Sequence, residues 1–133
     1  MSEIIVLDTH IWLWYINGDF DKFPEHWQQQ IKVADLVGIS PISCYEIVLA
    51  YTKGRLHLDI PVQQWLMDSL HPSGIELLSL TPEISFRAVN LSPIHKDPFD
   101  RIIIATALEY KAMLASVDSL FSRYSELKNV LLT

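Results

Sequence analysis

Short apolar runs alternate along the chain with stretches in which apolar residues recur at helical spacing. The run Ile4-Ile5-Val6-Leu7 and the run Met113–Val117 are typical of strands buried on both faces. Shorter apolar segments predict further strands between and after them. Strands are expected at 4–7, 37–40, 75–80 and 113–117, with a short final strand at 130–132.

Helical periodicity fills the intervals between these strands. Residues Val62, Trp65, Leu66 and Leu70, for example, place their side chains on one face of a helix. The segment 98–111 is apolar nearly all round, which predicts a central, buried helix. We expect helices to open at Thr9, Pro24, Ser43, Pro61, Thr81, Asp97 and Ser119. Strands separated by helices imply right-handed crossovers, a mostly parallel sheet, and helices on both faces.

Length and composition favour one compact domain over residues 1–133, because half of the residues are hydrophobic. No run approaches the ~20 apolar residues needed to span a bilayer, so no membrane association is expected. The N-terminus lacks the features of a secretion signal, and we expect a cytoplasmic protein. Cys44 is the single cysteine, which excludes an internal disulfide and a multi-cysteine zinc site.

Four acidic residues occupy similar places relative to the predicted elements. Asp8 directly follows the first strand and Asp118 the fourth, while Glu46 and Asp100 are expected in the first turns of helices. Each one, taken singly, is explained as a helix cap or a first-turn acid. Ser43 and Glu46, for instance, have the spacing of a capping box.

Taken together, the acids point to a metal site. The carboxyl ends of parallel strands meet at one edge of a sheet, where ligands bind. Clustered carboxylates repel one another and therefore take up protons or bind cations. An all-oxygen ligand set suits Mg²⁺ or Mn²⁺ better than Zn²⁺. Such ions activate water for phosphodiester hydrolysis.

The net charge of −6 argues against a general nucleic-acid coat protein. If bound cations neutralise four of the sixteen acidic residues, however, the remaining acidic residues outnumber the ten basic ones by only two. A local patch from Lys53, Arg55, Lys96 and Arg101 is then a candidate contact for phosphates.

Four segments carry a resemblance to a known family. They are VLDTHIWLW at 6–14, SCYEIVLAYTKGRL at 43–56, HKDPFDRIIIATA at 95–107 and LASVDSLFSRY at 114–124. In order and spacing the chain resembles the PIN-domain nucleases, especially VapC-type toxins of bacterial toxin–antitoxin pairs. The most specific of the four is the HKDPFDR segment with its helix rich in Ile and Ala.

The resemblance implies a three-layer α/β/α fold with four to five strands and a Mg²⁺- or Mn²⁺-dependent endoribonuclease activity that leaves 5′-phosphate and 3′-hydroxyl ends. It also implies a cognate antitoxin that blocks the site, and a homodimer. Carried over by position, Asp8, Glu46, Asp100 and Asp118 become the metal-binding and catalytic acids. The supporting residues are Ser116, Asp97, Thr9 and Arg101.

Several of the remaining residues near the proposed site have a simpler interpretation. Asp97 is expected mainly to cap its helix, and Thr9 to cap the first one. Arg101 either steers phosphate or pairs with Asp100. His10 and His95 are interpreted as structural or surface residues, not as ligands. Tyr45 departs from the Trp that relatives often carry before the Glu.

Other functions remain as alternatives. Receiver domains and haloacid-dehalogenase-type phosphatases also place an Asp after the first strand. The latter require a second Asp two residues later, where this chain has His10. A catalytically silent PIN-like module that binds RNA or protein, or an RNA-processing PIN nuclease outside a toxin–antitoxin pair, is the other alternative.

Overall fold

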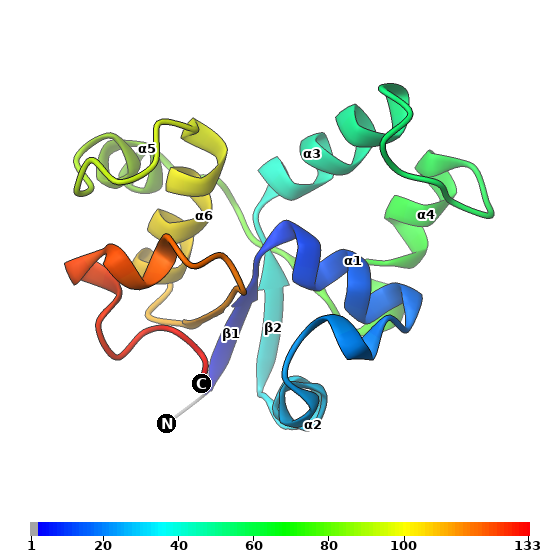
Figure 1. The fold of residues 1–133 in the computed structure, drawn as a ribbon, viewed down its shortest axis with the longest axis horizontal. Helices are drawn as coiled ribbons and strands as arrows, with labels where there is room; N and C mark the ends of the chain where they lie inside the picture. Colours follow the sequence, from blue (N-terminus) through cyan, green and yellow to red (C-terminus); the bar gives the residue numbers. More distant parts are fainter. Residues whose placement is uncertain (1–2) are drawn as a thin grey trace.

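The computed structural model describes residues 3–133, and its centre is a parallel four-stranded sheet (Figure 1). The strands are β1 (Ile4–Leu7), β2 (Leu36–Ile39), β3 (Glu76–Leu77) and β4 (Met113–Ala115). They lie in the order β3-β2-β1-β4, and every pairing is parallel. The predicted α/β architecture with a mostly parallel sheet is confirmed.

Helices cover both faces of this sheet. They are α1 (Thr9–Asn17), α2 (Glu25–Val33), α3 (Pro41–Thr52), α4 (Val62–Asp68), α5 (Pro82–Val89) and α6 (Pro98–Glu109). Short 3-10 turns lie at Phe20–Lys22, His71–Ser73, Phe121–Arg123 and Ser125–Leu127. Within residues 3–133, none of the helices has the length and apolar character that crossing a bilayer requires.

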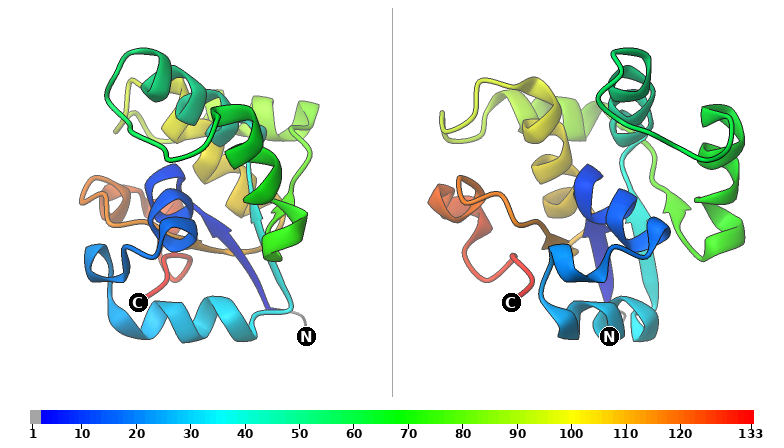
Figure 2. Two further views of the ribbon diagram at one scale, coloured as in Figure 1. Left: turned by 90° about the vertical axis from the view of Figure 1, so that its right-hand side faces the viewer. Right: turned by 45° about the vertical axis from the view of Figure 1, so that its right-hand side comes forward.

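The three layers follow from the alternation of side chains along β1. Ile5 and Leu7 face a core built with α1, α2 and α4, whereas Val6 faces a second core built with α6 and the C-terminal segment. Figures 1 and 2 show these two groups of helices on opposite sides of the sheet, with α2 lying across the end where the strands begin. Both faces of the strands are therefore buried.

Several predicted element boundaries were wrong. Strand β4 ends at Ala115 and not at 117, and the helix expected to open at Ser119 is a 3-10 turn at Phe121–Arg123. Helix α3 begins at Pro41, because Ser40 caps it by accepting the Ile42 N–H, so Ser43 does not open it. Strand β3 is confined to two residues, since its partner β2 ends at Ile39. The expected final strand is a single bridge between Leu131 and Leu114.

The connection order creates a switch point in the sheet. The chain moves outward from β1 to β2 and β3, and then returns to the other side of β1 to form β4. Connections therefore leave the ends of β1 and β4 in opposite directions, which opens a crevice at their carboxyl ends. Asp8 enters this crevice directly after β1, and its N–H donates to the carbonyl of Ala115 at 3.0 Å.

Candidate metal centre

Asp8 and Asp118 are joined through one hydroxyl group. Ser116 donates from its Oγ to Asp8 Oδ2 at 2.7 Å and accepts the N–H of Asp118 at 3.1 Å. Asp118 in turn accepts the Leu120 N–H on Oδ1 at 2.9 Å, which shapes the turn after β4. Asp8 occupies the N-cap position of α1 but makes no side-chain cap bond. Its carboxylate, only 8% exposed, is directed to the crevice instead.

Glu46 is held by a second hydroxyl chain. Thr9 Oγ1 donates to Glu46 Oε1 at 2.6 Å and lies 2.8 Å from Ser43 Oγ. Because the single Thr9 hydroxyl hydrogen is used on Glu46, Ser43 is the donor in the second bond. The expected roles of Thr9 and Ser43 as helix caps were therefore wrong. Glu46 stands in the second turn of α3, from which it reaches the end of β1.

Asp100 lies in the first turn of α6, as predicted, and meets Asp118 through His95. His95 Nε2 is 3.1 Å from Asp118 Oδ2 and 3.8 Å from Asp100 Oδ2. One donor atom from each of these three residues lies within 4.8 Å of the others, a spacing able to hold a metal ion. The sheet edge and the start of α6 thus contribute to one cluster.

Burial and mutual repulsion perturb these carboxyl groups. Desolvation raises the pKa of Asp100 to about 6; His95 opposes the shift, and the charges of Asp8, Asp97 and Glu46 add to it. Burial also raises the pKa of Asp8, against the hydrogen bond from Ser116. The pKa of Glu46 is raised by burial too, against the bond from Thr9. The fully charged cluster is therefore unfavourable until a cation compensates it.

Asp97 caps α6 as expected, since its Oδ1 accepts the Phe99 N–H at 2.9 Å. The role proposed for Arg101 was wrong. Its guanidinium has five N–H donors, and they reach five backbone carbonyls at 2.8 to 3.3 Å. The acceptors are Ala88, Val89, Leu91, Ser92 and His95. Arg101 therefore holds the segment that leads to His95, and its donors are not free for phosphate or for Asp100.

Sequence reasoning missed the position of His95. Its side chain is buried and lies within the cluster, whereas His10 is exposed at the edge of α1. The sequence did contain a signal for this position. His95 lies shortly before Asp100, one turn ahead of the start of α6, in the HKDPFDR segment on which the family resemblance rests. Spacing alone does not tell which way the ring points.

A groove of about 670 Å³ leads away from the cluster between α1 and α3. Thr9, Glu46 and Asp97 line it at the cluster, and exposed basic side chains line it farther out. Those basic residues are Lys22, Lys53 and Arg55. Lys53 and Arg55 belong to the predicted phosphate patch, whereas Lys96 does not line the groove.

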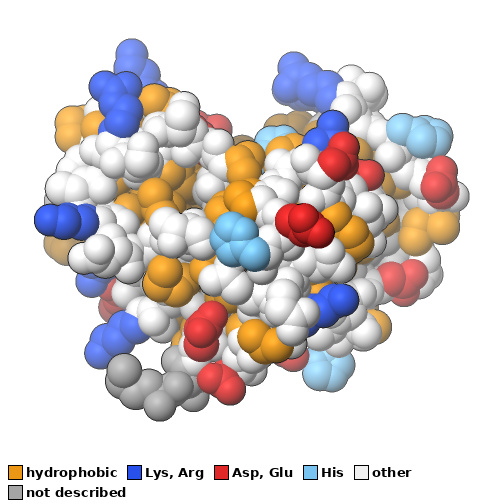
Figure 3. Space-filling model, turned by 60° about the horizontal axis from the view of Figure 1, so that its bottom comes forward, with side chains coloured by type: hydrophobic (Ala, Val, Ile, Leu, Met, Phe, Trp, Pro, Cys, Tyr) orange, Lys and Arg blue, Asp and Glu red, His pale blue; other side chains and the backbone are white. Residues whose placement is uncertain are grey.

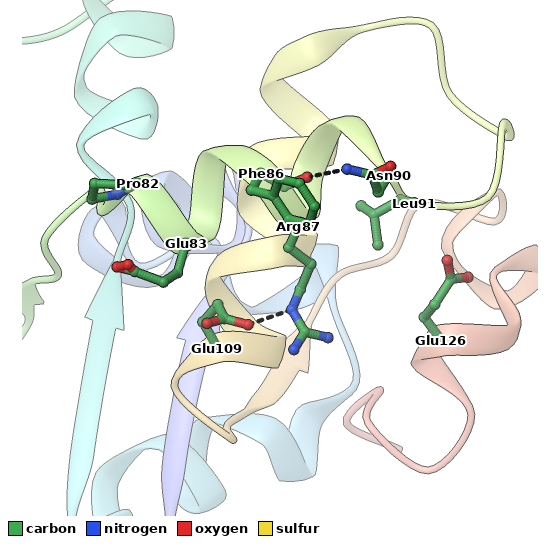
Figure 4. Close-up of a pocket in the computed structure, with 8 residues that line it drawn as sticks. All are labelled: Pro82, Glu83, Phe86, Arg87, Asn90, Leu91, Glu109 and Glu126. Atoms are coloured by element: carbon green, nitrogen blue, oxygen red, sulfur yellow. Dashed lines mark hydrogen bonds and ion pairs between the residues drawn. The ribbon is translucent and has the colours of Figure 1, made fainter.

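A second hollow, of about 580 Å³, lies over α5, where Arg87 pairs with Glu109 (Figure 4). Glu109 ends α6 nine residues after Asp100, so this hollow is about 13 Å farther along the helix. Figure 3, tilted to bring forward the end where the strands begin, shows acidic and basic side chains dispersed, not gathered.

Comparison with known proteins identifies the family. The family model of the PIN domain matches residues 5–127. The chain belongs to the PIN-domain family. This PIN-domain chain is 30% identical over 115 residues to ribonuclease VapC22 of Mycobacterium tuberculosis, an alignment that covers 86% of both proteins.

Solved structures agree with this PIN-domain fold. A chain of VapBC2 from Rickettsia felis, bound to a DNA fragment from its promoter, superposes with a TM-score of 0.70 at 19% identity. The match covers 98% of this chain and 97% of that one. A toxin–antitoxin complex from Klebsiella pneumoniae gives a TM-score of 0.59 at 20% identity, covering 97% and 96%. The predicted three-layer fold is confirmed.

Proposed function

We propose that this PIN-domain chain is a Mg²⁺- or Mn²⁺-dependent endoribonuclease and the toxin of a VapBC-type toxin–antitoxin pair. The observation that carries the proposal is the convergence of Asp8, Glu46, Asp100 and Asp118 at the switch point of the sheet. Similarity to ribonuclease VapC22 over 86% of the chain supports RNA as the substrate.

The donor set fits a hard divalent cation. The four proposed ligands offer carboxylate oxygens only, which Mg²⁺ and Mn²⁺ prefer. Burial, with repulsion among the acids as a smaller cause, raises the pKa values of Asp8, Glu46 and Asp100, so their charged forms are disfavoured until a cation binds. When bound, the ion supplies water activation and stabilises the charge that develops on the phosphate.

The chain's own residues have distinct tasks in this proposal. Asp8, Asp100 and Asp118 form the central ligand set, and Glu46 completes it or assists a second ion. Ser116 ties the carboxylate of Asp8, which follows β1, to the backbone N–H of Asp118, which follows β4, and Thr9 orients Glu46. Fixed hydroxyl donors keep the acids oriented, so little reorganisation is required during the reaction.

The groove between α1 and α3 is the proposed path for the RNA strand. Its inner end opens at Glu46, and its outer part carries Lys53 and Arg55. Exposed cations along a groove attract the phosphate backbone without reading sequence. Trp14 lines the same groove and offers an aromatic surface for a base.

Partners and location complete the proposal. Similarity to chains of toxin–antitoxin complexes supports a cognate antitoxin that covers the site. We place both proteins in the cytoplasm.

A homodimer is proposed from the family resemblance. Size-exclusion chromatography with light scattering tests the dimer. Rescue of a growth-arrested bacterial host by the gene adjacent to this one tests the antitoxin.

The central experiment is cleavage of a fluorogenic RNA by the purified protein. We expect cleavage with Mg²⁺ or Mn²⁺, loss of cleavage in excess EDTA, and at least a 100-fold loss in Asp8→Asn. The exposed Asp21, replaced by Asn, is the matched control and should retain activity. Undiminished cleavage by Asp8→Asn, or in EDTA, would refute the mechanism. Binding of RNA without cleavage would favour a silent PIN-like module.

A further inference from the structure

His95 is a buried polar residue to which the proposed function assigns no task. Its ring lies between two proposed metal ligands, Asp100 and Asp118, and is 8% exposed. A histidine here has two possible roles. It either binds the metal through Nε2 or orients the carboxylates that do.

The position of the His95 ring is fixed from several sides. Arg101 donates to the His95 carbonyl, and the His95 N–H donates to the Tyr124 hydroxyl at 2.9 Å. The ring stacks on Tyr124 with centroids 5.5 Å apart and meets Phe121 edge-on at 5.1 Å. Tyr124 is 2% exposed, so water does not replace these contacts.

The hydrogen bonds around Tyr124 determine where the His95 ring carries its proton. Tyr124 Oη accepts the backbone N–H of His95, and among the described residues His95 Nδ1, 2.9 Å away, is the acceptor within reach of its own hydrogen. Nδ1 is then the acceptor, and the ring proton is on Nε2, facing Asp118 Oδ2 at 3.1 Å.

The other tautomer of the His95 ring is unfavourable. A proton on Nδ1 leaves the buried Tyr124 O–H without an acceptor, and it leaves the Nε2 lone pair facing a carboxylate oxygen. A buried polar group without a partner costs roughly 1–3 kcal/mol.

We propose that His95 is a positioning residue: its ring donates from Nε2 to Asp118 and is itself oriented by Tyr124. With its proton on Nε2 and its Nδ1 lone pair engaged by Tyr124, the ring has no free lone pair for a metal, so the proposal gives His95 no ligand role. Together with the Leu120 N–H on Oδ1, this bond fixes both carboxylate oxygens of Asp118. The inference rests on the proposed function, since it concerns the acids of that metal site.

Nitrogen NMR of the histidine ring tests the tautomer directly. In uniformly ¹⁵N-labelled protein near neutral pH, His95 Nε2 should show the chemical shift of a protonated nitrogen and Nδ1 that of an acceptor. Saturating Mg²⁺ should leave Nε2 protonated. A proton on Nδ1 with none on Nε2 in the free protein, or loss of the Nε2 proton on Mg²⁺ addition, would overturn the proposal. The free-protein spectrum is informative even if the chain cleaves no RNA.

Metal titration calorimetry tests the hydrogen bond. Loss of a partner that orients a ligand typically weakens metal binding 10- to 100-fold, which we expect for His95→Leu with Mg²⁺. His95→Gln restores an N–H donor and should bind within about 3-fold of wild type. The exposed His26, replaced by Gln, is the matched control. Equal losses in the Leu and Gln variants, or no loss in either, would contradict the proposal.

Tyr124→Phe tests the same chain of bonds without altering His95. It removes the hydroxyl and should mix the two ring tautomers in the NMR spectrum, with a several-fold loss of Mg²⁺ affinity. Tyr110→Phe, which removes a hydroxyl that donates to the Ser79 carbonyl elsewhere, is the control. An unchanged tautomer in Tyr124→Phe would refute the role of Tyr124, even where His95→Leu does not fold.

Discussion

Ser116 donates a hydrogen bond of 2.7 Å from its hydroxyl to the carboxylate of Asp8, across 108 positions of the sequence. The same oxygen accepts the Asp118 N–H. One hydroxyl therefore sets the spacing between an acid that follows β1 and an acid that follows β4. The two strands are neighbours in the sheet, so this bond joins the chain ends that leave them.

Replacement of Ser116 by Ala should impair the site more than the fold. The Asp8 carboxylate loses a donor, and we expect about 10-fold weaker Mg²⁺ binding with a stability loss of about 1 kcal/mol. Ser116→Thr retains the hydroxyl and should behave as wild type. Calorimetry and urea denaturation measure the two effects. Ser122→Ala, which removes an exposed hydroxyl, is the control, and equal behaviour of all three variants would argue against the bridge.

Asp100 should destabilise the metal-free protein above pH 6. Its pKa is raised from 3.8 to about 6 in the folded state, so the folded chain binds more protons than the unfolded one between these values. Its contribution to stability is complete below about pH 4 and is lost as the pH rises through 6.

Asp100→Asn should therefore stabilise the metal-free protein near neutral pH but not at pH 4. Since the side chain is partly exposed, solvent screening limits the gain to on the order of 1 kcal/mol, or about 4 °C in Tm. Thermal melts in EDTA across pH measure it. Mg²⁺ should raise the Tm of wild type but not of the variant. A variant Tm at or below wild type at every pH would contradict this account.

Arg101→Lys should loosen the segment that carries His95. Lysine has three donors around one point charge, so at least two of the five carbonyls lose their partner. We expect a loss of about 2 kcal/mol and faster hydrogen exchange over residues 88–95. Arg87→Lys alters only a half-exposed ion pair with Glu109 and should cost less than about 1 kcal/mol. Comparable losses in both variants would contradict the assignment.

Lys53 and Arg55 should contribute to RNA affinity and not to catalysis. Their joint replacement by Ala removes two phosphate contacts, so the slope of log K against log salt should fall by about 1.4. KM should rise about 10-fold with kcat nearly unchanged. Fluorescence anisotropy with a single-stranded RNA measures the slope. Lys128 and Arg123, which lie outside the groove, provide the matched double variant; an equal effect there would mean the groove is not the RNA path.

Much of this fold was predictable from local pattern. Apolar runs identified β1 and β4 because both strands are buried on two faces, and periodicity located every long helix. Boundaries were less predictable where two caps competed: Ser40 and Ser43 both suit an N-cap, and the bond from Ile42 to Ser40 decides between them. Strand β3 is short because its partner strand ends, which is not visible in its own residues.

The candidate site likewise has a part that the sequence predicts and a part that only the tertiary structure shows. Asp8, Asp100 and Asp118 could be proposed from sequence, since each stands at the end of a strand or the start of a helix. The sequence by itself determined the order of the main elements and proposed these acids as site residues, because burial and periodicity are encoded over a few neighbouring residues. Only the tertiary structure decided what orients them: Ser116 on Asp8, Thr9 on Glu46, and His95 on Asp118. These bonds join residues that are 23 to 108 positions apart in the sequence. The chain brings these side chains together only when it folds back to form β4. A pattern over a few neighbouring residues cannot specify which side chains then come within hydrogen-bonding distance.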